Sequence, residues 1–534
     1  MKYIAAFDIG TTAVKSVLCG EDGTLSASGS VDIHTIFGGE NAEYKEQDPA
    51  EWYSAFCRIS AGFFRDGKAA PEDIAAIVMS GQMQDVIPVD QQLLPVGNAI
   101  LYSDGRGEPQ SEAIKRALGE EYLERSTGNH YDGSLSFPKL MWIRENQPER
   151  FQKIDKVLIS SKDYVIARLT GNACGDVTAC ATAGAMDIHR KVWDETIIRC
   201  GGISPALFPK LLHSHQKAGA VHEKGAQESG YPVGTPVYAG VGDAGATTLA
   251  SGISDLGQYN INLGTSGWVA TVSDDVLPAQ MGVFNLAAMP EDRYINVVPF
   301  LNAGNVHKWI STIFAGQDNA AAGKDTAGRA KQGKDAAGRA GQDNTEAGQA
   351  GQSDPVIDYE AINRILERST AGSSGLMFLP YLAGERFPVM DAEIRGCFVG
   401  ISPETKREDM VRACLEGVAF SIRQGIESIG TAPKKVSVIG GGGRVAVWCQ
   451  ILADVLGQTV DVYKNADILP SLAISAAALL GEGKLSGYEA FTDSLQNEEN
   501  RIAYTPETAN TARYNEIYRR YLRIYPAVRP IFEP

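Results

Sequence analysis

Apolar and polar positions along the first 80 residues follow two different periods. The runs YIAAFDI (3–9) and AVKSVLC (13–19) are apolar-rich and are separated by a Gly-Thr-Thr turn, which predicts two strands joined by a tight turn. Apolar residues then recur at helical spacing, at Trp52, Phe56, Ile59 and Phe63. A β-rich run, IAAIVMS (74–80), follows. The pattern predicts a β-meander that leads into alternating helices and strands, and hence an α/β fold.

The second half of the chain repeats this order of elements. NINLGTSGWVATV (260–272) predicts a strand, a glycine turn and a returning strand. KVSVIGGGG (435–443) predicts a strand that runs into glycines, followed by the helical pattern VAVWCQILADVLG (445–457). Two similar α/β halves are the simplest interpretation.

Residues 316–354 differ from the rest of the second half. They are rich in Gly and Ala and contain no aromatic or large aliphatic residue, and GKDTAGRA (323–330) nearly repeats as GKDAAGRA (333–340). Such a segment has little to bury, so it cannot offset the entropy lost on ordering. We expect a disordered surface insertion.

Length and charge narrow the class of protein. At 534 residues the chain is long enough for two or three domains of about 100–200 residues each. The 65 acidic residues exceed the 49 basic ones, giving a net charge of −16, which argues against a nucleic-acid-binding protein. No run approaches the roughly 20 apolar residues of a membrane span, and the eight cysteines show no CxxC spacing. We expect a cytoplasmic protein with reduced thiols and neither membrane nor nucleic-acid partners.

The segment DIGTTAVK (8–15) has the form of a phosphate cradle. Gly10 allows close approach of the backbone, and the turn offers N–H groups together with the hydroxyls of Thr11 and Thr12. Lys15 follows on the returning strand, and Asp8 could hold a hydrated magnesium ion. An ordinary hairpin turn remains the alternative interpretation.

NLGTSGW (262–268) repeats this device in the second half, with Gly264, Thr265 and Ser266 in the turn. The glycine run at 440–443 adds a strand-to-helix junction where Gly441, Gly442 and Gly443 leave space for a base or ribose. A tightly packed corner would use the same glycines. Two such turns in two similar halves favour a nucleotide that binds between the halves and contacts both.

GVGDAGATTLASG (240–252) places Asp243 between small residues, directly after a β-rich run. A carboxylate at that position commonly caps the next helix. It could equally be a base at the bottom of a cleft, where it would accept the proton of a nucleophilic hydroxyl.

These segments form an ordered set together with SGQMQ (80–84), YSDGR (102–106), FLPYLAGERFP (378–388), RGCFVGIS (395–402) and LEGVAFSIR (415–423). The set resembles the FGGY carbohydrate kinases, and within them the xylulokinase-like branch, from about residue 3 to about residue 490. The resemblance implies two actin-like (ribonuclease-H-like) ATPase domains flanking a cleft.

The expected domains are 1–253, which would bind sugar, and 254–505, which would bind nucleotide and carry the insertion. Residues 506–534 form a third part, a C-terminal docking helix and tail. Its apolar positions recur at helical spacing, at Tyr514, Ile517, Tyr518, Tyr521 and Ile524.

The resemblance also implies roles for single residues. Asp243 would be the general base and Asp8 would organise Mg²⁺. The residues near the phosphates of ATP would be Gly10, Thr11, Thr12, Lys15, Gly264, Thr265 and Ser266, and those beside the adenosine would be Gly441, Gly442 and Gly443.

For the sugar, the resemblance points to Met83, Gln84, Asp104 and Arg106. The chain departs from xylulokinase-like sequences at Gln84, where His is usual, and at Asp85, where Gly is usual. It departs again at Val445, where Ser or Asn is common near the base.

The implied activity is transfer of the γ-phosphate of MgATP to a hydroxyl of a ketopentose, with D-xylulose as the first expectation. A hexonate such as gluconate, or another polyol, is the alternative acceptor. A non-catalytic, nucleotide-dependent sugar sensor with the same fold is the alternative from another class. Family habit favours a homodimer.

Overall fold

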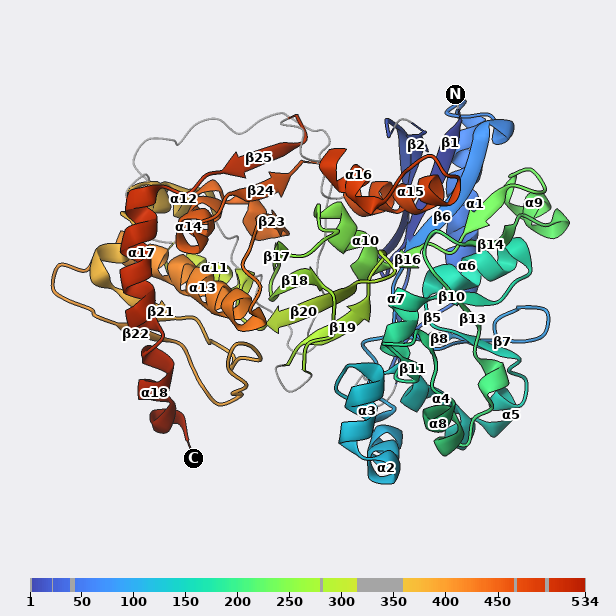
Figure 1. The fold of residues 1–534 in the computed structure, drawn as a ribbon, viewed down its shortest axis with the longest axis horizontal. Helices are drawn as coiled ribbons and strands as arrows, with labels where there is room; N and C mark the ends of the chain where they lie inside the picture. Colours follow the sequence, from blue (N-terminus) through green and yellow to red (C-terminus); the bar gives the residue numbers. More distant parts are fainter. Residues whose placement is uncertain are drawn as a thin grey trace, which may run out of the picture.

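The structure is a computed structural model of the chain, and it describes residues 2–21, 23–38, 44–278, 282–314, 359–464, 468–494 and 499–533. The predicted insertion 316–354 lies outside the described residues. Two α/β bodies lie side by side, the first holding the N-terminus and the second the C-terminus (Figure 1).

The first body is built on a sheet with the strand order β14-β15-β6-β1-β2-β3. Its strands are β1 (Tyr3–Ile9), β2 (Ala13–Gly20), β3 (Leu25–Asp32), β6 (Ile74–Gly81), β14 (Lys217–Ala220), β15 (Pro236–Tyr238) and the short β16 (Val241–Gly242), which also pairs with β6. Strands β1, β2 and β3 form the predicted antiparallel meander, while β6 joins β1 in parallel.

The second body is built on a sheet with the order β19-β20-β18-β17-β23-β24-β25. Its strands are β17 (Gln258–Leu263), β18 (Gly267–Ser273), β19 (Phe284–Ala287), β20 (Tyr294–Phe300), β23 (Lys435–Ile439), β24 (Val460–Tyr463) and β25 (Arg501–Tyr504). The path β20-β18-β17-β23-β24 repeats the path β3-β2-β1-β6-β15 in order and in strand direction. The prediction of two similar α/β halves is confirmed.

Both faces of the first sheet are covered by helices. The helices of the first body include α1 (Pro49–Arg65), α4 (Ser136–Asn146), α6 (Ser161–Thr170), α7 (Val177–Cys180) and α10 (Asp243–Ala250). Ala5, Phe7 and Ile9 of β1 pack with α1 and α6, while the alternate residues Ile4 and Ala6 face the other way. This period of two is what a strand buried on both faces requires.

The other face of the first sheet is covered by a helix from late in the chain. Helix α15 (Leu469–Gly481) lies beside β1 and β6 (Figure 1) and buries Ala473 and Ile474 against Ile4 and Ala6. The expected boundaries assign α15 to the second domain, whereas in the structure it packs against the first sheet. It therefore ties the two bodies together.

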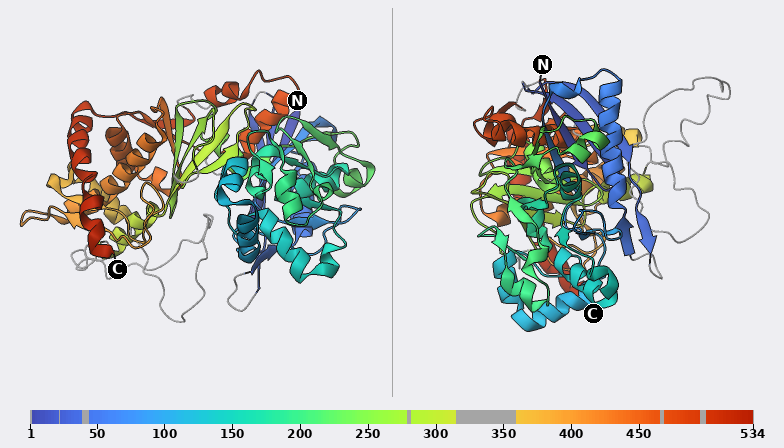
Figure 2. Two further views of the ribbon diagram at one scale, coloured as in Figure 1. Left: turned by 60° about the horizontal axis from the view of Figure 1, so that its bottom comes forward. Right: turned by 90° about the vertical axis from the view of Figure 1, so that its right-hand side faces the viewer.

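The C-terminal helices lie at the outer end of the second body, away from the first (Figures 1 and 2). They are α17 (Thr508–Tyr521) and α18 (Ile524–Phe532), and they join a core formed with α11 (Gly304–Phe314), α12 (Tyr359–Glu367), α13 (Arg407–Ile429) and α14 (Ala446–Leu456). The five apolar positions expected on the docking helix are all buried there, at Tyr514, Ile517, Tyr518, Tyr521 and Ile524.

All eight cysteines fall within the described residues, and all are free thiols. In the same part of the chain every helix is too short or too polar to cross a bilayer.

Candidate active site

Strand register places Asp8 at the carboxyl end of β1 between two polar neighbours. Lys15 of β2 and Ser80 of β6 are its partners in the sheet, and the Ser80 hydroxyl donates to Asp8 Oδ1 at 2.8 Å. Burial raises the pKa of Asp8, although Ser80 and Lys15 oppose the shift. Asp8 is therefore a half-buried carboxylate on a rigid edge, as a metal-organising group requires.

The turn after β1 is held by a buried amide network. Gln82 accepts a bond from Thr11 Oγ1 at 2.8 Å, and Gln47 Nε2 donates to the Thr11 carbonyl at 2.7 Å. Gln47 Oε1 in turn accepts from Gln82 Nε2 at 2.8 Å and from Trp52 Nε1 at 3.0 Å. Thr12 is left exposed at the tip of the turn. The network fixes the turn while leaving its outer surface free to meet a ligand.

Asp243 is the first residue of α10 and comes directly after β16, which pairs with the end of β6. Asp8 and Asp243 therefore stand at the same edge of the sheet. Burial raises the pKa of Asp243 to about 7, and the charge of Asp8 adds to this effect. A carboxyl group with this pKa can release and take up a proton near neutral pH, as a general base must.

This pKa sets an expected pH profile. As the expected base, Asp243 would accept a proton only when ionised, so kcat/KM should rise about tenfold per pH unit up to roughly pH 7 and level off above it. The check is kcat/KM for the acceptor between pH 5.5 and 8.5 at saturating MgATP. A profile that is flat across this range would contradict the assignment of Asp243.

Beneath Asp243 lies a buried charge cluster. Lys162 Nζ, fully buried, pairs with Asp163 and, at 2.8 Å, with Asp176 Oδ2. Burial disfavours the charged lysine, but the two carboxylates outweigh it and raise the pKa of Lys162. Asp176 Oδ1 also accepts the backbone N–H of Gly242 at 3.3 Å, so the cluster supports the residue just before Asp243.

The second body brings the other glycine turns into one cavity of about 540 Å³. Its lining residues are Leu263, Gly264, Thr265, Gly304, Asn305, His307, Lys308, Asn363, Gly441, Gly442, Arg444, Val445 and Trp448. The N–H groups of Gly304 and Asn305 donate to the carbonyls of Gly264 and Thr265, both at 2.8 Å, so the start of α11 fixes the turn. A Cβ on Gly304 would collide with the Gly264 carbonyl, so this contact requires glycine.

Two of the nucleotide residues expected in the second body do not line this cavity. Ser266 is exposed in the turn, one residue beyond the lining Thr265. Gly443 is buried, with Val438 and Val462 as its nearest neighbours. No hydrogen bond or ion pair among the described residues links the turn at 10–12 to this cavity.

Met83 and Gln84 lie close to the Asp243 edge. Met83 packs on Gly242, where a Cβ would collide with its sulfur, so the small residue brings Met83 next to Asp243. Gln84 has a φ of 64°, in the left-handed region, and its Nε2 donates to Ser134 Oγ at 2.8 Å. The structure thus places Met83 beside Asp243, and Gln84 follows it in the chain with its side chain on Ser134.

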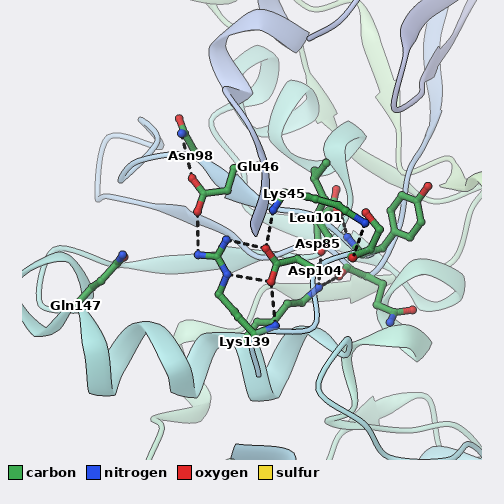
Figure 3. A network of polar contacts seen from close by, with 12 residues as sticks. Lys45, Glu46, Asp85, Asn98, Leu101, Asp104, Lys139 and Gln147 are labelled. Atoms are coloured by element: carbon green, nitrogen blue, oxygen red, sulfur yellow. Dashed lines mark hydrogen bonds and ion pairs between the residues drawn. The ribbon is translucent and has the colours of Figure 1, made fainter. Parts of the chain in front are cut away.

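Asp104, which Figure 3 labels, and Arg106 are buried and bind each other. Arg106 Nε and Nη2 donate to the two oxygens of Asp104 at 2.9 and 2.6 Å, and Nη1 lies 2.9 Å from Glu46. The guanidinium also lies 4.0 Å from the ring centre of Tyr44 and 4.9 Å from that of Trp142. The Arg106 side chain is only 2% exposed. In the structure the pair stabilises its own loop, and the polar groups of Arg106 are used in these contacts.

Sequence reasoning missed Lys139, Lys162 and Asp176. Lys162 and Asp163 stand together in an otherwise apolar stretch, with Ser160 and Asp163 forming a capping box, and this pattern could have pointed to a buried pair. Lys139, in PKLMWIREN (138–146), resembles an ordinary surface lysine, and no signal in the sequence reveals its burial.

The repeated sheet order, the acidic edge of the first body and the glycine-lined cavity of the second define a two-domain phosphotransferase. A model of the FGGY family of carbohydrate kinases, N-terminal domain, matches residues 3–250, and the C-terminal-domain model of the same family matches residues 259–471. The chain belongs to the FGGY family and is a carbohydrate kinase. The expected actin-like two-domain α/β fold is confirmed.

Individual relatives agree with this assignment. The chain is 27% identical to a xylulose kinase of Staphylococcus xylosus, over 98% of this chain and 100% of the relative. It is also 27% identical to a gluconokinase of Bacillus subtilis (strain 168), over 92% of this chain and 90% of the relative. The crystal structure of a xylulose kinase from Rhodospirillum rubrum superposes with a TM-score of 0.81 at 25% identity, over 99% of this chain and 100% of that one.

Proposed function

We propose that the chain transfers the γ-phosphate of MgATP to a hydroxyl of an uncharged ketose, with D-xylulose as the leading acceptor. The observation that carries this proposal is Asp243, whose pKa of about 7 suits a base and which shares a sheet edge with Asp8. The xylulose kinases among its relatives support the choice of acceptor.

The residues of the second body fit a nucleotide. Gly264 and Thr265 would meet the β- and γ-phosphates, while Gly441 and Gly442 leave room for the adenosine. Asn363 Oδ1 is buried at this cavity and has no hydrogen-bond partner among the described residues, so it can accept a bond from an adenine amino group. This acceptor would replace the polar contact that Val445 cannot make.

His307 and Trp448 supply an aromatic part of the same cavity. Their ring centres are 5.7 Å apart, and burial lowers the pKa of His307 to about 4, so its ring is neutral at physiological pH. A neutral aromatic surface suits the flat, uncharged adenine base.

The residues of the first body fit Mg²⁺ and the transferring phosphate. Asp8 supplies a carboxylate of the kind that holds a hydrated Mg²⁺, which would neutralise charge on the phosphates when bound. Gly10, Thr11 and Thr12 offer N–H and hydroxyl donors, and the exposed Lys15 adds a positive charge next to Asp8.

Asp243 would take the proton of the attacking hydroxyl. Met83 lies next to Asp243, and Met83 and Gln84 would orient the acceptor, a step in which position matters as much as basicity. Because the two phosphate turns lie on different bodies, closure of one body on the other would bring the γ-phosphate to the acceptor and exclude water.

The charges around the site favour an uncharged acceptor. The guanidinium of Arg106 is paired with two carboxylates, the ammonium of Lys139 with two backbone carbonyls and that of Lys162 with two carboxylates. Lys15 is assigned to the phosphate. The carboxylate of a hexonate would face the charge of Asp8 and Asp243, and none of these four described cations is free to pair with it, which disfavours a hexonate. A ketose has no such charge.

A panel of acceptors tests this proposal. ADP release with MgATP should be stimulated by D-xylulose or a similar ketose at least tenfold more, in kcat/KM, than by gluconate. Gluconate as the preferred acceptor would contradict the charge argument. ADP release that no acceptor stimulates, although ATP binds, would favour the sugar-sensor alternative.

A further inference from the structure

Two segments carry the residues expected to read the acceptor, 82–86 and 99–106. One pair of reciprocal backbone–backbone hydrogen bonds joins them, from Val86 N to Ile100 O at 2.9 Å and from Ile100 N to Val86 O at 3.0 Å. Beyond this bridge both segments leave regular strand pairing. Backbone hydrogen bonds tie each segment to other parts of the chain, Asp85 to Ile159 and Leu101 to Lys45. The further direct links between the two segments are made by side chains.

Lys139 of α4 connects the two segments from below. Its side chain is fully buried, and Nζ donates to the carbonyl of Gln84 at 2.8 Å and to that of Leu101 at 2.9 Å. Figure 3 shows Lys139 beneath Leu101, Asp104 and Asp85. Within the described residues no carboxylate oxygen lies within ion-pair distance of Nζ, so the two carbonyls are its direct partners.

The bond to Gln84 holds a strained residue. Gln84 is not glycine, yet its φ is 64°, a conformation that a side chain disfavours. That conformation turns its carbonyl to Lys139, while its side-chain amide reaches Ser134. Without Lys139, Gln84 would lose one of the hydrogen bonds that hold it in this disfavoured conformation.

Asp85 adds a third connection between the segments. Its carboxyl group is fully buried, and Oδ1 accepts the backbone N–H of Tyr102 at 3.1 Å. Its own N–H donates to the Ile159 carbonyl at 3.0 Å, which fixes the residue from the other side. Glycine, the usual residue here in xylulokinase-like sequences, could not make the bond to Tyr102.

We propose that Lys139 and Asp85 are positioning residues that clamp the segments 82–86 and 99–106 together and so set the affinity for the acceptor. The clamp acts on the backbone of Gln84, Leu101 and Tyr102 and does not itself touch the acceptor. Its link to acceptor affinity rests on the proposed sugar kinase function.

Four variants test the clamp: Lys139→Met, Asp85→Ala, Asp85→Asn and, as a control with the same lysine-to-methionine change, the exposed Lys153→Met. Amide hydrogen exchange is measured on the peptides covering 82–86 and 99–106, with 262–267 as an internal reference. Lys139→Met and Asp85→Ala should speed exchange at least fivefold in both segments and leave the reference unchanged. Asp85→Asn keeps the Oδ1 acceptor, so its exchange should stay close to that of the wild type.

Kinetics then separate positioning from general damage. Lys139→Met and Asp85→Ala should raise KM for the acceptor at least tenfold while KM for ATP stays within twofold, and Lys153→Met should change neither constant. Unchanged exchange in the two segments, Asp85→Asn exchanging as fast as Asp85→Ala, or an unchanged acceptor KM would each overturn the clamp.

If Lys139→Met does not fold, the two Asp85 variants still decide the question. A wild-type protein that phosphorylates no acceptor would contradict the proposed function alone, because the exchange comparison still reports on the clamp.

Discussion

Replacing Asp243 with asparagine is expected to lower kcat by about 10²- to 10⁴-fold, the usual contribution of a positioned general base. Asparagine keeps the shape of the side chain but cannot take up the proton of the acceptor hydroxyl. ATP should bind with unchanged affinity, because the cavity lined by Gly264, Thr265, Gly441 and Gly442 lies in the other body. Single-turnover kinetics together with ATP titration would measure both quantities.

The same substitution should stabilise the free protein at alkaline pH. Since burial and Asp8 raise the pKa of Asp243, its ionised form opposes folding, and this cost grows as the pH rises from the ordinary carboxyl pKa to about 7. Asp243→Asn should therefore melt at a higher temperature than the wild type at pH 8 and at nearly the same temperature at pH 4. The exposed Asp274→Asn is the matched control. Loss of activity together with loss of stability at pH 8 would indicate damage to the fold instead of loss of a base.

Replacing Lys162 with methionine is expected to destabilise the protein by about 3–5 kcal/mol, the usual cost of removing one member of a buried ion pair. The substitution leaves Asp163 and Asp176 facing each other without a cation in a buried position. Urea unfolding at pH 7.5 measures the change in the free energy of unfolding. The exposed Lys153→Met should cost less than about 0.5 kcal/mol.

Acidic pH should reduce the loss of stability that Lys162→Met causes. Burial raises the pKa of Asp163 although Lys162 opposes the shift, so acid protonates this carboxyl group earlier than an exposed one and reduces its need for the cation. The difference in stability between Lys162→Met and the wild type should therefore be smaller at pH 5 than at pH 7.5. If Lys162→Met lowers the free energy of unfolding by less than 1 kcal/mol at pH 7.5, the cluster does not support the structure around Asp243.

The elements most predictable from sequence are the local ones. The β1–β2 hairpin and the buried face of α1 follow from apolar periods of two and of 3.6 residues, and both appear as expected. The strand order of the two sheets is a long-range property that no local period encodes. What the sequence predicts at this level is the actin-like fold, and that prediction rests on the resemblance of the ordered motifs to a known family.

The candidate site was predictable as a set of segments, but the direction of each side chain was not. Asp104 and Arg106 looked like sugar ligands from their motif, yet Glu46, Tyr44 and Trp142, from distant segments, enclose Arg106. In the glycine run Gly441 and Gly442 line the cavity while Gly443 faces Val438 and Val462, because the 3₁₀ turn at Gly441–Arg444 rotates successive residues away from each other. Such directions depend on tertiary packing.

The most direct test of the central claim is to follow the phosphate itself. Phosphorus NMR of the purified protein with MgATP and D-xylulose would show whether a new phosphomonoester forms. The account predicts one sugar phosphomonoester for each ADP, and almost none with Asp243→Asn. ADP accompanied only by inorganic phosphate, or an equal yield from Asp243→Asn, would contradict it.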